Sequence, residues 1–305
     1  MKFFIGIDGG ASKTELLVLD ENRQPVLQRV FGSSNMLLAE AVQTRQELYQ
    51  AIDTLQGLYP DGEFMSCFGL SGLDTEADAI RAREFYQAGL TKVCGNHCQI
   101  VNDGWIAMRA GTKSANALVL ISGTGSNCLG KNDRGQTAKA GGMDYLLSDE
   151  GSGYEIGLMT LRAALRSYDG RDEKSKLEEK VRVAFKVNSI GNLKNLIYEP
   201  LISKKDIAGL AKICFEAESE GDVKARQIIN QAVEELFLMV KAVADRLELQ
   251  QRQADLVMVG GVLDQMSARA LLMSRVRQFF PEMSTVFPTR TSAYGACLLA
   301  IESFK

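Results

Sequence analysis

The sequence predicts an α/β protein with two lobes, each built on a mixed sheet flanked by helices. The chain has 305 residues, enough for two domains of the usual size of roughly 100 to 200 residues. Short apolar runs, typical of buried strands, alternate with stretches of helical spacing. In addition, segments 5–20 and 120–130 repeat one pattern, in which a strand, a turn of glycine and hydroxyl residues and a second strand follow each other. The repeat indicates that the sheet is duplicated.

The first copy of this hairpin has the composition of a phosphate-binding loop. Its glycines can take positive φ and let main-chain N–H groups approach an anion closely. Its hydroxyls supply further donors, its lysine adds a positive charge, and its aspartate could face a magnesium ion through water. The residues concerned are Asp8, Gly9, Gly10, Ser12, Lys13 and Thr14.

The second copy offers the same glycines and hydroxyls. Its residues are Gly123, Thr124, Gly125 and Ser126. Two such hairpins could clamp a nucleoside triphosphate. The alternative is that each hairpin is only a glycine turn, and the occurrence of two copies weakens that interpretation.

Two other phosphate motifs do not match. A Walker A loop requires glycine immediately before the Lys-Thr pair and a helix after it, whereas Ser12 precedes Lys13 and an apolar run typical of a strand follows. A dinucleotide fingerprint beginning at Gly123 would need its last glycine where the chain has Cys128, and it also requires a following helix. Both motifs are therefore excluded.

Strands and helices alternate along the rest of the first half. After the hairpin we expect a strand at 26–31, a loop at 32–35, a helix at 39–55, a strand at 65–70, a helix at 75–88 and a strand at 99–102. This order favours a largely parallel sheet, whose ligands bind beyond the carboxyl ends of the strands. Asp103 directly follows the last strand. We expect the first domain to comprise residues 1–113.

The second half begins with the same three-strand order, from 117 to about 139. A long, mainly helical stretch, 154–249, follows, and a buried strand at 256–259 then leads into Gly260 and Gly261. One further helix and a final helix at 291–304 complete the chain. These elements form the expected second domain, residues 114–305.

Composition and charge narrow the functional classes. The net charge is -3, with acidic and basic residues interspersed, so there is no broad positive field for nucleic-acid binding. We see no export signal and no apolar stretch of membrane-spanning length, and we expect a cytoplasmic protein with reduced cysteines. Cys94 and Cys98 flank the only histidine, His97, and we interpret them as small buried hydrophobes because no second cysteine pair lies nearby. Carboxylates should therefore carry any acid-base chemistry.

Five blocks of the sequence, taken in order, resemble the N-acetylglucosamine kinase and benzoyl-CoA-reductase-activator family of ATPases. These blocks are Asp8-Gly9-Gly10 with Ser12-Lys13-Thr14, Asn102-Asp103, Ser122-Gly123-Thr124-Gly125-Ser126, Gly141-Gly142 with Asp149-Glu150-Gly151-Ser152, and Gly260-Gly261. The resemblance spans nearly the whole chain. It implies the two-lobed actin-like ATPase fold, also called ribonuclease H-like, which sugar kinases share with actin and heat-shock chaperones.

The resemblance also implies an activity and a set of roles. The family member would be a kinase that uses ATP and Mg²⁺, closes its lobes on ATP and an amino sugar, and transfers the γ-phosphoryl group to the sugar 6-hydroxyl. Asp103 matches the catalytic base, Asp8 would face the metal, the two hairpins would hold phosphates, and Gly260 and Gly261 would approach the adenosine. The residues that would line the sugar are Asn35, Asp103, Thr124, Gly142, Met143 and Asp149. The expected partner is a small amino sugar, and a homodimer is an option left open.

Some residues have simpler interpretations, and others depart from the family pattern. Asp103 and Asp149 each precede an expected helix and could be its N-cap, and Asn35 could only satisfy its own turn. N-acetylglucosamine kinases of this family commonly have an aromatic residue after the asparagine and a tryptophan after the paired glycines, whereas this chain has Met36 and Met143-Asp144-Tyr145. The N-substituent of the sugar therefore stays open. In a glucosamine kinase, Asp144 could face the ammonium group.

Two rival functions also stay open. One is an activator ATPase that carries an iron–sulfur cluster, which would need suitably placed cysteine thiolates. The other is a non-catalytic regulator that senses ATP or a hexosamine, although no DNA-binding module is visible at either end.

Overall fold

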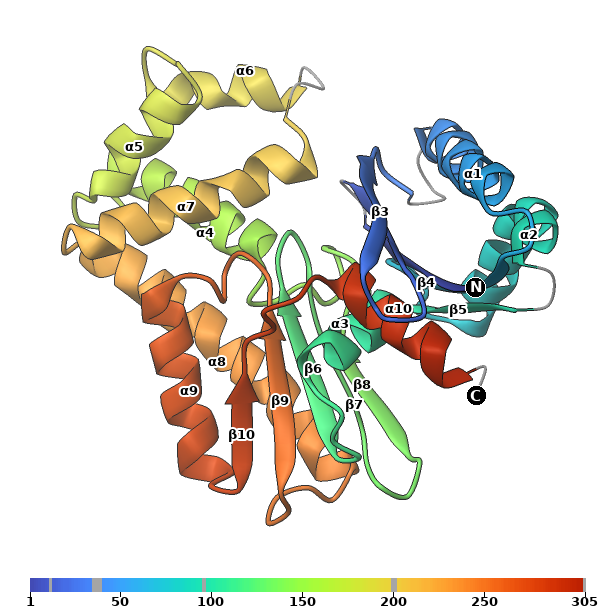
Figure 1. Cartoon of the computed structure of the whole chain (residues 1–305). Helices are drawn as coiled ribbons and strands as arrows, with labels where there is room; N and C mark the ends of the chain where they lie inside the picture. Colours follow the sequence, from blue (N-terminus) through green and yellow to red (C-terminus); the bar gives the residue numbers. More distant parts are fainter. Residues whose placement is uncertain (11–12, 35–39, 95–96, 199–201, 304–305) are drawn as a thin grey trace. The chain divides into compact units, whose positions relative to one another are not determined.

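The chain forms two compact units, each with its own sheet (Figure 1). The computed structural model describes all residues except 11–12, 35–39, 95–96, 199–201 and 304–305. The first unit comprises Met1–Ser114 and Val286–Lys305, and the second comprises Ala115–Thr285. Each unit contains a five-stranded sheet. The predicted duplication of a mixed sheet flanked by helices is therefore confirmed.

The sheet of the first unit mixes antiparallel and parallel strands. Its strands are β1 (Lys2–Gly9), β2 (Thr14–Leu19), β3 (Pro25–Phe31), β4 (Glu63–Leu70) and β5 (Cys98–Asn102), in the spatial order β3-β2-β1-β4-β5. β1 and β2 form the predicted hairpin, whereas β1, β4 and β5 run parallel. The carboxyl ends of these three strands consequently lie at the same edge of the sheet, which is where α/β sheets bind ligands.

The sheet of the second unit repeats this topology strand for strand. Its strands are β6 (Ala117–Ser122), β7 (Ser126–Lys131), β8 (Thr137–Gly141), β9 (Ala254–Val259) and β10 (Met283–Val286), in the order β10-β9-β6-β7-β8. The β6–β7 hairpin thus corresponds to β1–β2, and β9, which pairs parallel with β6, corresponds to β4. Our sequence analysis missed β10, because this four-residue strand has too short an apolar run to be recognised alone.

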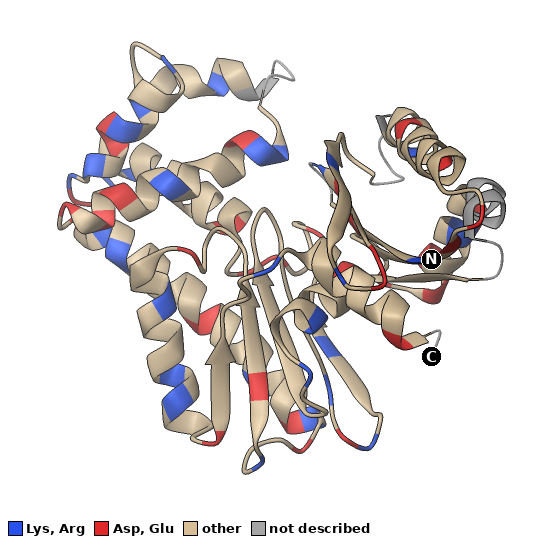
Figure 2. Ribbon diagram, in the orientation of Figure 1, with Lys and Arg blue, Asp and Glu red and all other residues tan. Residues whose placement is uncertain are grey.

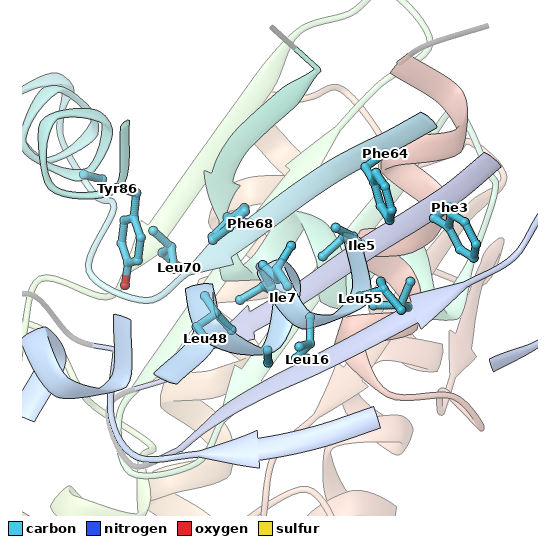
Figure 3. Packing of buried hydrophobic residues seen from close by; sticks show 14 residues of the cluster. Phe3, Ile5, Ile7, Leu16, Leu48, Leu55, Phe64, Phe68, Leu70 and Tyr86 are labelled. Atoms are coloured by element: carbon cyan, nitrogen blue, oxygen red, sulfur yellow. The ribbon is translucent and has the colours of Figure 1, made fainter. Parts of the chain in front are cut away.

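Helices cover both faces of the first sheet. α1 (Glu40–Leu58) and α2 (Glu76–Cys94) pack on one face, where a cluster of apolar side chains fills the interior (Figure 3). Phe3, Ile5 and Ile7 of β1 all belong to this cluster because alternate residues of a strand point to the same side. Leu48 of α1 and Tyr86 of α2 belong to the same cluster, in which the ring of Tyr86 lies 5.6 Å from that of Phe68.

The opposite face of β1 is covered by α10 (Ser292–Ser303), together with α3 (Asp103–Gly111). Contact is very close at Gly6, where an added Cβ would lie 2.1 Å from the carbonyl oxygen of Ala293. This packing joins α10 to the first unit, although we had expected the second domain to run to residue 305. The physical reason is that the small, apolar residues of α10 are buried against β1 and α3, a pairing that no local pattern reveals.

The long region between β8 and β9 is mainly helical, as predicted. It contains α4 (Gly153–Tyr168), α5 (Lys176–Ala184), a 3₁₀ turn (Ile190–Asn192), α6 (Leu193–Tyr198), α7 (Lys204–Ser219) and α8 (Val223–Arg246), and α9 (Met266–Phe279) follows β9. α8 contacts β6, β7 and β8, so it covers one face of the second sheet, whereas α4 packs mainly on α7. The side chain of Ser152 caps the N-terminus of α4. Ser203 caps the N-terminus of α7 as part of a capping box. These caps fix the residues at which the two helices begin.

Residues with charged side chains of both signs are interspersed along the ribbon of each unit (Figure 2). This distribution matches the small net charge of the sequence, -3. Among the described residues, no helix combines the length and apolar character that crossing a membrane requires.

Candidate active site

The β1–β2 hairpin places Asp8 at the carboxyl end of β1. Asp8 lies opposite Glu15 in the antiparallel register, and the N–H of Gly10 donates to the carbonyl of Lys13 at 2.9 Å to close the turn. Lys13 is exposed at this turn. Two predicted residues, Ser12 and Asn35, lie outside the described residues.

Two of the four hairpin glycines, Gly9 and Gly125, are needed for a reason that we did not predict. None of Gly9, Gly10, Gly123 and Gly125 is among the described residues with positive φ, so that expectation was wrong. Close packing explains two of them instead: a Cβ on Gly9 would lie 2.5 Å from the Ser34 hydroxyl, and one on Gly125 would lie 2.9 Å from Oδ1 of Asp149. These approaches leave no room for a side chain.

Two of the four predicted hydroxyl donors bond within their own unit. The Thr14 hydroxyl is buried and donates to the Gly32 carbonyl at 2.8 Å, which ties β2 to the end of β3. The Ser126 hydroxyl donates to the Glu150 carbonyl at 2.6 Å. Thr124, by contrast, is exposed at the tip of the second hairpin. The hydroxyls of Thr14 and Ser126 therefore form hydrogen bonds that stabilise the conformation of the hairpins.

Asp8 and Asp103 concentrate negative charge at the edge of the first sheet. Burial, followed by the nearby carboxylates of Asp103 and Glu15, raises the pKa of Asp8 from its ordinary 3.8 to about 7, and Lys13 opposes the shift only weakly. Such a site favours a cation, because a positive charge would relieve both the burial penalty and the repulsion. Oxygen ligands are those that Mg²⁺ prefers. The donor set therefore suits the predicted magnesium ion, with Asp8 as the residue that would hold it.

Asp103 is the first residue of α3, and it is not the N-cap. That role belongs to Asn102, whose side chain accepts a hydrogen bond from the N–H of Gly104 at 2.9 Å. The Asn102 amide also donates to the Leu73 carbonyl at 3.1 Å, which fixes the end of β5. Oδ1 of Asp103 is buried. The capping interpretation of Asp103 is therefore wrong.

Asp149 links the second hairpin to the start of the helical region. Only 7% of the residue is exposed. Its Oδ1 accepts a hydrogen bond from the main-chain N–H of Ser126 at 3.1 Å, and its Oδ2 accepts one from the ammonium of Lys204 at 2.9 Å. Ser152, three residues later, caps α4 by accepting from the N–H of Glu155. Asp149 is thus not an N-cap either, and its carboxylate is held beside the hairpin.

The predicted sugar residues Gly142 and Met143 lie in a tight loop before Asp149. Gly141, Gly142 and Asp144 all have positive φ, between 72° and 73°. The loop is closed at its base, where the N–H of Met143 donates to the Ser148 hydroxyl at 2.8 Å. The side chain of Met143 is about half exposed, at 48%. The structure therefore brings Gly142, Asp149 and the second hairpin together in the second unit.

The Gly260–Gly261 pair packs directly against the same hairpin. Gly260 has a φ of 111°, and a Cβ on it would lie 2.2 Å from the Ser122 carbonyl oxygen. The N–H of Val262 donates to that carbonyl at 3.1 Å. Gly260 therefore lets the chain leave β9 in contact with the end of β6, the strand that leads into the second hairpin.

Sequence reasoning missed Lys204. This residue, at the first position of α7, reaches both Asp144 and Asp149, with Nζ to Oδ1 and Oδ2 distances of 2.8 and 2.9 Å. Burial acts to lower the pKa of Lys204, but the hydrogen bonds from its ammonium to the two carboxylates outweigh burial and raise it. The only local signal was the Ser203-x-x-Asp206 capping box, which marks where α7 begins.

Among the described cysteines, Cys67, Cys128, Cys214 and Cys297 are buried and Cys98 is half-buried. Burial raises the pKa of Cys98 to about 11 and that of Cys67 to about 12, so both thiols stay protonated near neutrality. A cluster ligand must be a thiolate. Within the described part of the chain, no group of three or more histidine, cysteine, aspartate or glutamate side chains could hold a metal ion. The side chain of Cys94 lies outside the described residues.

The duplicated sheet, with a glycine-rich hairpin at the corresponding position of each copy, defines the actin-like ATPase fold of sugar kinases. The chain belongs to the BadF/BadG/BcrA/BcrD ATPase family, which it matches over residues 5–300. This finding confirms the resemblance on which the site assignments were based.

Relatives with named activities match the chain over its full length. It is 34% identical over 311 residues to the N-acetylmuramic acid/N-acetylglucosamine kinase of Clostridium acetobutylicum, covering 98% of each chain. It is 28% identical over 321 residues to the N-acetyl-D-glucosamine kinase of Dictyostelium discoideum, covering 100% of this chain and 99% of the relative.

Solved structures agree on the fold. A protein from Chromobacterium violaceum, provisionally named an N-acetylglucosamine kinase, superposes with a TM-score of 0.75 at 22% identity, covering 98% of this chain and 99% of its own. A ROK hexokinase from Thermus thermophilus superposes with a TM-score of 0.60 at 14% identity, covering 99% of both chains. At these identities the likeness establishes the shared fold alone.

Proposed function

We propose that the protein is an ATP-dependent amino-sugar kinase that phosphorylates the 6-hydroxyl of N-acetylglucosamine or of a closely related hexosamine. The observation that carries the proposal is the pair Asp8 and Asp103 at the carboxyl edge of the first sheet, in a chain whose full-length relatives are named as kinases of such sugars. Asp8 would bind the metal–nucleotide complex, and Asp103 would accept the proton of the sugar hydroxyl.

Each residue contributes one part of the chemistry. Phosphoryl transfer requires alignment, neutralisation of phosphate charge and a group that accepts the proton of the attacking alcohol. Asp103 would accept that proton, because a carboxylate within hydrogen-bond reach of the attacking hydroxyl can act as a general base. Mg²⁺, held by Asp8, would neutralise phosphate charge. The two hairpins, 8–14 and 123–126, would present main-chain N–H groups to the phosphates, and Gly260 and Gly261 would border the adenosine.

The sugar subsite would include the residues that the second unit gathers around Asp149. A carboxylate accepts hydrogen bonds from sugar hydroxyls, and Gly142, Met143 and exposed Thr124 lie on the segments on either side of it. The family resemblance also assigns Asn35 and Asp103 to the sugar. Because one relative is named for both N-acetylmuramic acid and N-acetylglucosamine, a 3-O-substituted sugar is a second candidate substrate.

A coupled assay of ADP release tests the activity. The purified chain should release ADP from Mg-ATP with N-acetylglucosamine or N-acetylmuramic acid, and more slowly with glucosamine, N-acetylmannosamine or glucose. NMR of the product should place the phosphate on the 6-hydroxyl. ADP release that is independent of every hexosamine would contradict the proposal, and a stoichiometric iron–sulfur cluster in anaerobically purified protein would instead support the activator ATPase.

Asp103→Asn tests the role of the base. The variant is nearly isosteric, so we expect it to fold and to bind the sugar normally, with turnover lower by about 100-fold or more. Asn102→Ala serves as a matched control, because it removes the cap of α3 while it leaves the carboxylate in place; it should lower stability by about 1 kcal/mol. Unchanged turnover in Asp103→Asn would rule out the assignment and would favour a sensor that binds without catalysis.

A further inference from the structure

The ammonium of Lys204 lies in a cage of two carboxylates and two aromatic rings. Its Nζ donates to Oδ1 of Asp144 at 2.8 Å and to Oδ2 of Asp149 at 2.9 Å. The same atom lies 5.0 Å from the ring centroid of Tyr145 and 5.9 Å from that of Tyr154, and the two rings are 5.0 Å apart. We call these four residues the lysine cage.

The lysine cage has the chemistry of an ammonium-binding site. Carboxylate oxygens form strong, charge-assisted hydrogen bonds with an ammonium, and aromatic faces attract a cation within about 6 Å of the ring centroid. The cage is also part of the proposed sugar subsite, since Asp149 is one of its members and Met143 precedes Asp144 directly. The position where Asp144 could have met the ammonium of glucosamine is thus filled by a lysine of the same chain.

Lys204 is held in this position by the fold around it. The Ser203 main-chain N–H donates to Oδ2 of Asp206 at 2.8 Å, and the Asp206 N–H donates to the Ser203 hydroxyl at 3.2 Å, so the first turn of α7 is fixed. The N-terminus of this helix adds positive potential to that of the lysine itself. On the other side, Asp144 accepts from the Tyr145 N–H at 2.6 Å, which fixes its carboxylate.

We propose that Lys204 makes the sugar subsite selective for hexosamines whose nitrogen is acylated and neutral, and that it excludes the ammonium form of a free amino sugar. This inference rests on the proposed function, from which the place of Asp149 in the subsite comes. A free amino sugar would either have to displace the lysine from its carboxylates or bind beside a like charge. A neutral N-acyl sugar carries no ammonium, so it neither displaces the lysine nor is repelled by its charge. Lys204 is therefore a specificity-determining residue, and it does not act on the reacting atoms.

Measurement of kcat/KM for three sugars distinguishes the effect of the charge on the sugar nitrogen from the effect of the size of the substituent. Glucosamine and glucose differ at one position, where an ammonium replaces a hydroxyl of similar size, and N-acetylglucosamine is the neutral acylated sugar. In the wild-type chain the ratio of kcat/KM for glucosamine to that for glucose should be below one. In Lys204→Met and Lys204→Gln this ratio should rise by about tenfold or more, because removal of the lysine frees two carboxylates for the sugar ammonium.

Lys204→Arg is the matched control, because it keeps the positive charge at the cage, and its ratio should stay near the wild-type value. Lys204→Gln also guards against misfolding, since its amide can still donate to the buried Asp149. Calorimetric measurement of the binding of the three sugars gives the corresponding ratios of affinity without requiring turnover. An equal ratio in all four proteins, or a wild-type preference for glucosamine over glucose, would overturn the inference. Absence of ADP release from the wild-type chain would refute only the proposed function, because the binding ratios would still decide the role of Lys204.

Discussion

The main-chain N–H of Ser126 donates a hydrogen bond to Oδ1 of Asp149 at 3.1 Å. Two neighbouring bonds strengthen this connection: the Ser126 hydroxyl donates to the Glu150 carbonyl at 2.6 Å, and the Ser122 hydroxyl donates to the Gly151 carbonyl at 2.8 Å. The second hairpin and the segment before α4 therefore form one rigid element. A change at Asp149 should thus affect both the proposed sugar subsite and the proposed phosphate loop.

Gly125→Ala should disturb this element directly. The added methyl would lie 2.9 Å from Oδ1 of Asp149, so either the carboxylate or the hairpin must move. We expect the free energy of unfolding to fall by about 1–3 kcal/mol and the KM for the sugar to rise. Gly123→Ala is the control for stability, because its Cβ would meet nothing within 4 Å. Equal melting temperatures for the two variants in thermal denaturation would contradict the packing argument.

Asp8→Asn should remove a pH dependence of stability that Asp8 causes. The pKa of Asp8 is raised from 3.8 to about 7 in the folded chain, so the folded state keeps a proton that the unfolded state loses. Stability is therefore fully present below about pH 4 and is lost as pH rises to about 7, by roughly 4 kcal/mol at most. The variant lacks this loss and should be more stable than the wild type above pH 7, although inactive if Asp8 holds the metal.

Urea unfolding of both proteins across this pH range measures the effect. Asp61→Asn, a change at an exposed carboxylate, provides the control and should follow the wild-type curve. If Asp8→Asn and the wild type kept a constant difference in unfolding free energy from pH 4 to 8, the shifted pKa of Asp8 would be refuted.

Gly260→Ala should be strongly destabilising. Its φ of 111° is strained for any residue with a side chain, and its Cβ would lie 2.2 Å from the Ser122 carbonyl oxygen. We expect a loss of about 3 kcal/mol or more, because strain and overlap act together. The adjacent Gly261→Ala meets nothing within 4 Å and should change the melting temperature little. Similar melting temperatures for both would show that β9 can leave the sheet by another path.

Much of the fold could be predicted because strong local patterns mark it. The apolar runs 5–7 and 117–121, each followed by glycine and hydroxyl residues, identified both hairpins and hence the duplication. The predicted strand at 256–259 agrees with β9, Ala254–Val259, and the long helical stretch agrees with α4 to α8. Asp103 and Asp149 could be identified from the sequence because each lies in one of the five blocks that resemble the family.

Other features left no local trace. β10 has only four residues, and its pairing with β9 depends on the rest of the sheet. The positive-φ explanation of the hairpin glycines was wrong. Gly9 and Gly125 are instead required by the close approach of Ser34 and Asp149, which are distant in the sequence. Lys204 is 55 residues from Asp149, and only the packing of the helical region joins them.

By itself, the sequence determined the α/β class and the duplicated hairpins, and it predicted which residues would contact phosphate, metal and sugar, because apolar runs, glycines and carboxylates form recognisable patterns over a few positions. Only the tertiary structure decided that α10 packs on β1, that burial beside Asp103 raises the pKa of Asp8, and that Lys204 fills the cage around Asp149. These properties depend on burial and on charges brought together from distant segments, and both arise only when the chain has folded.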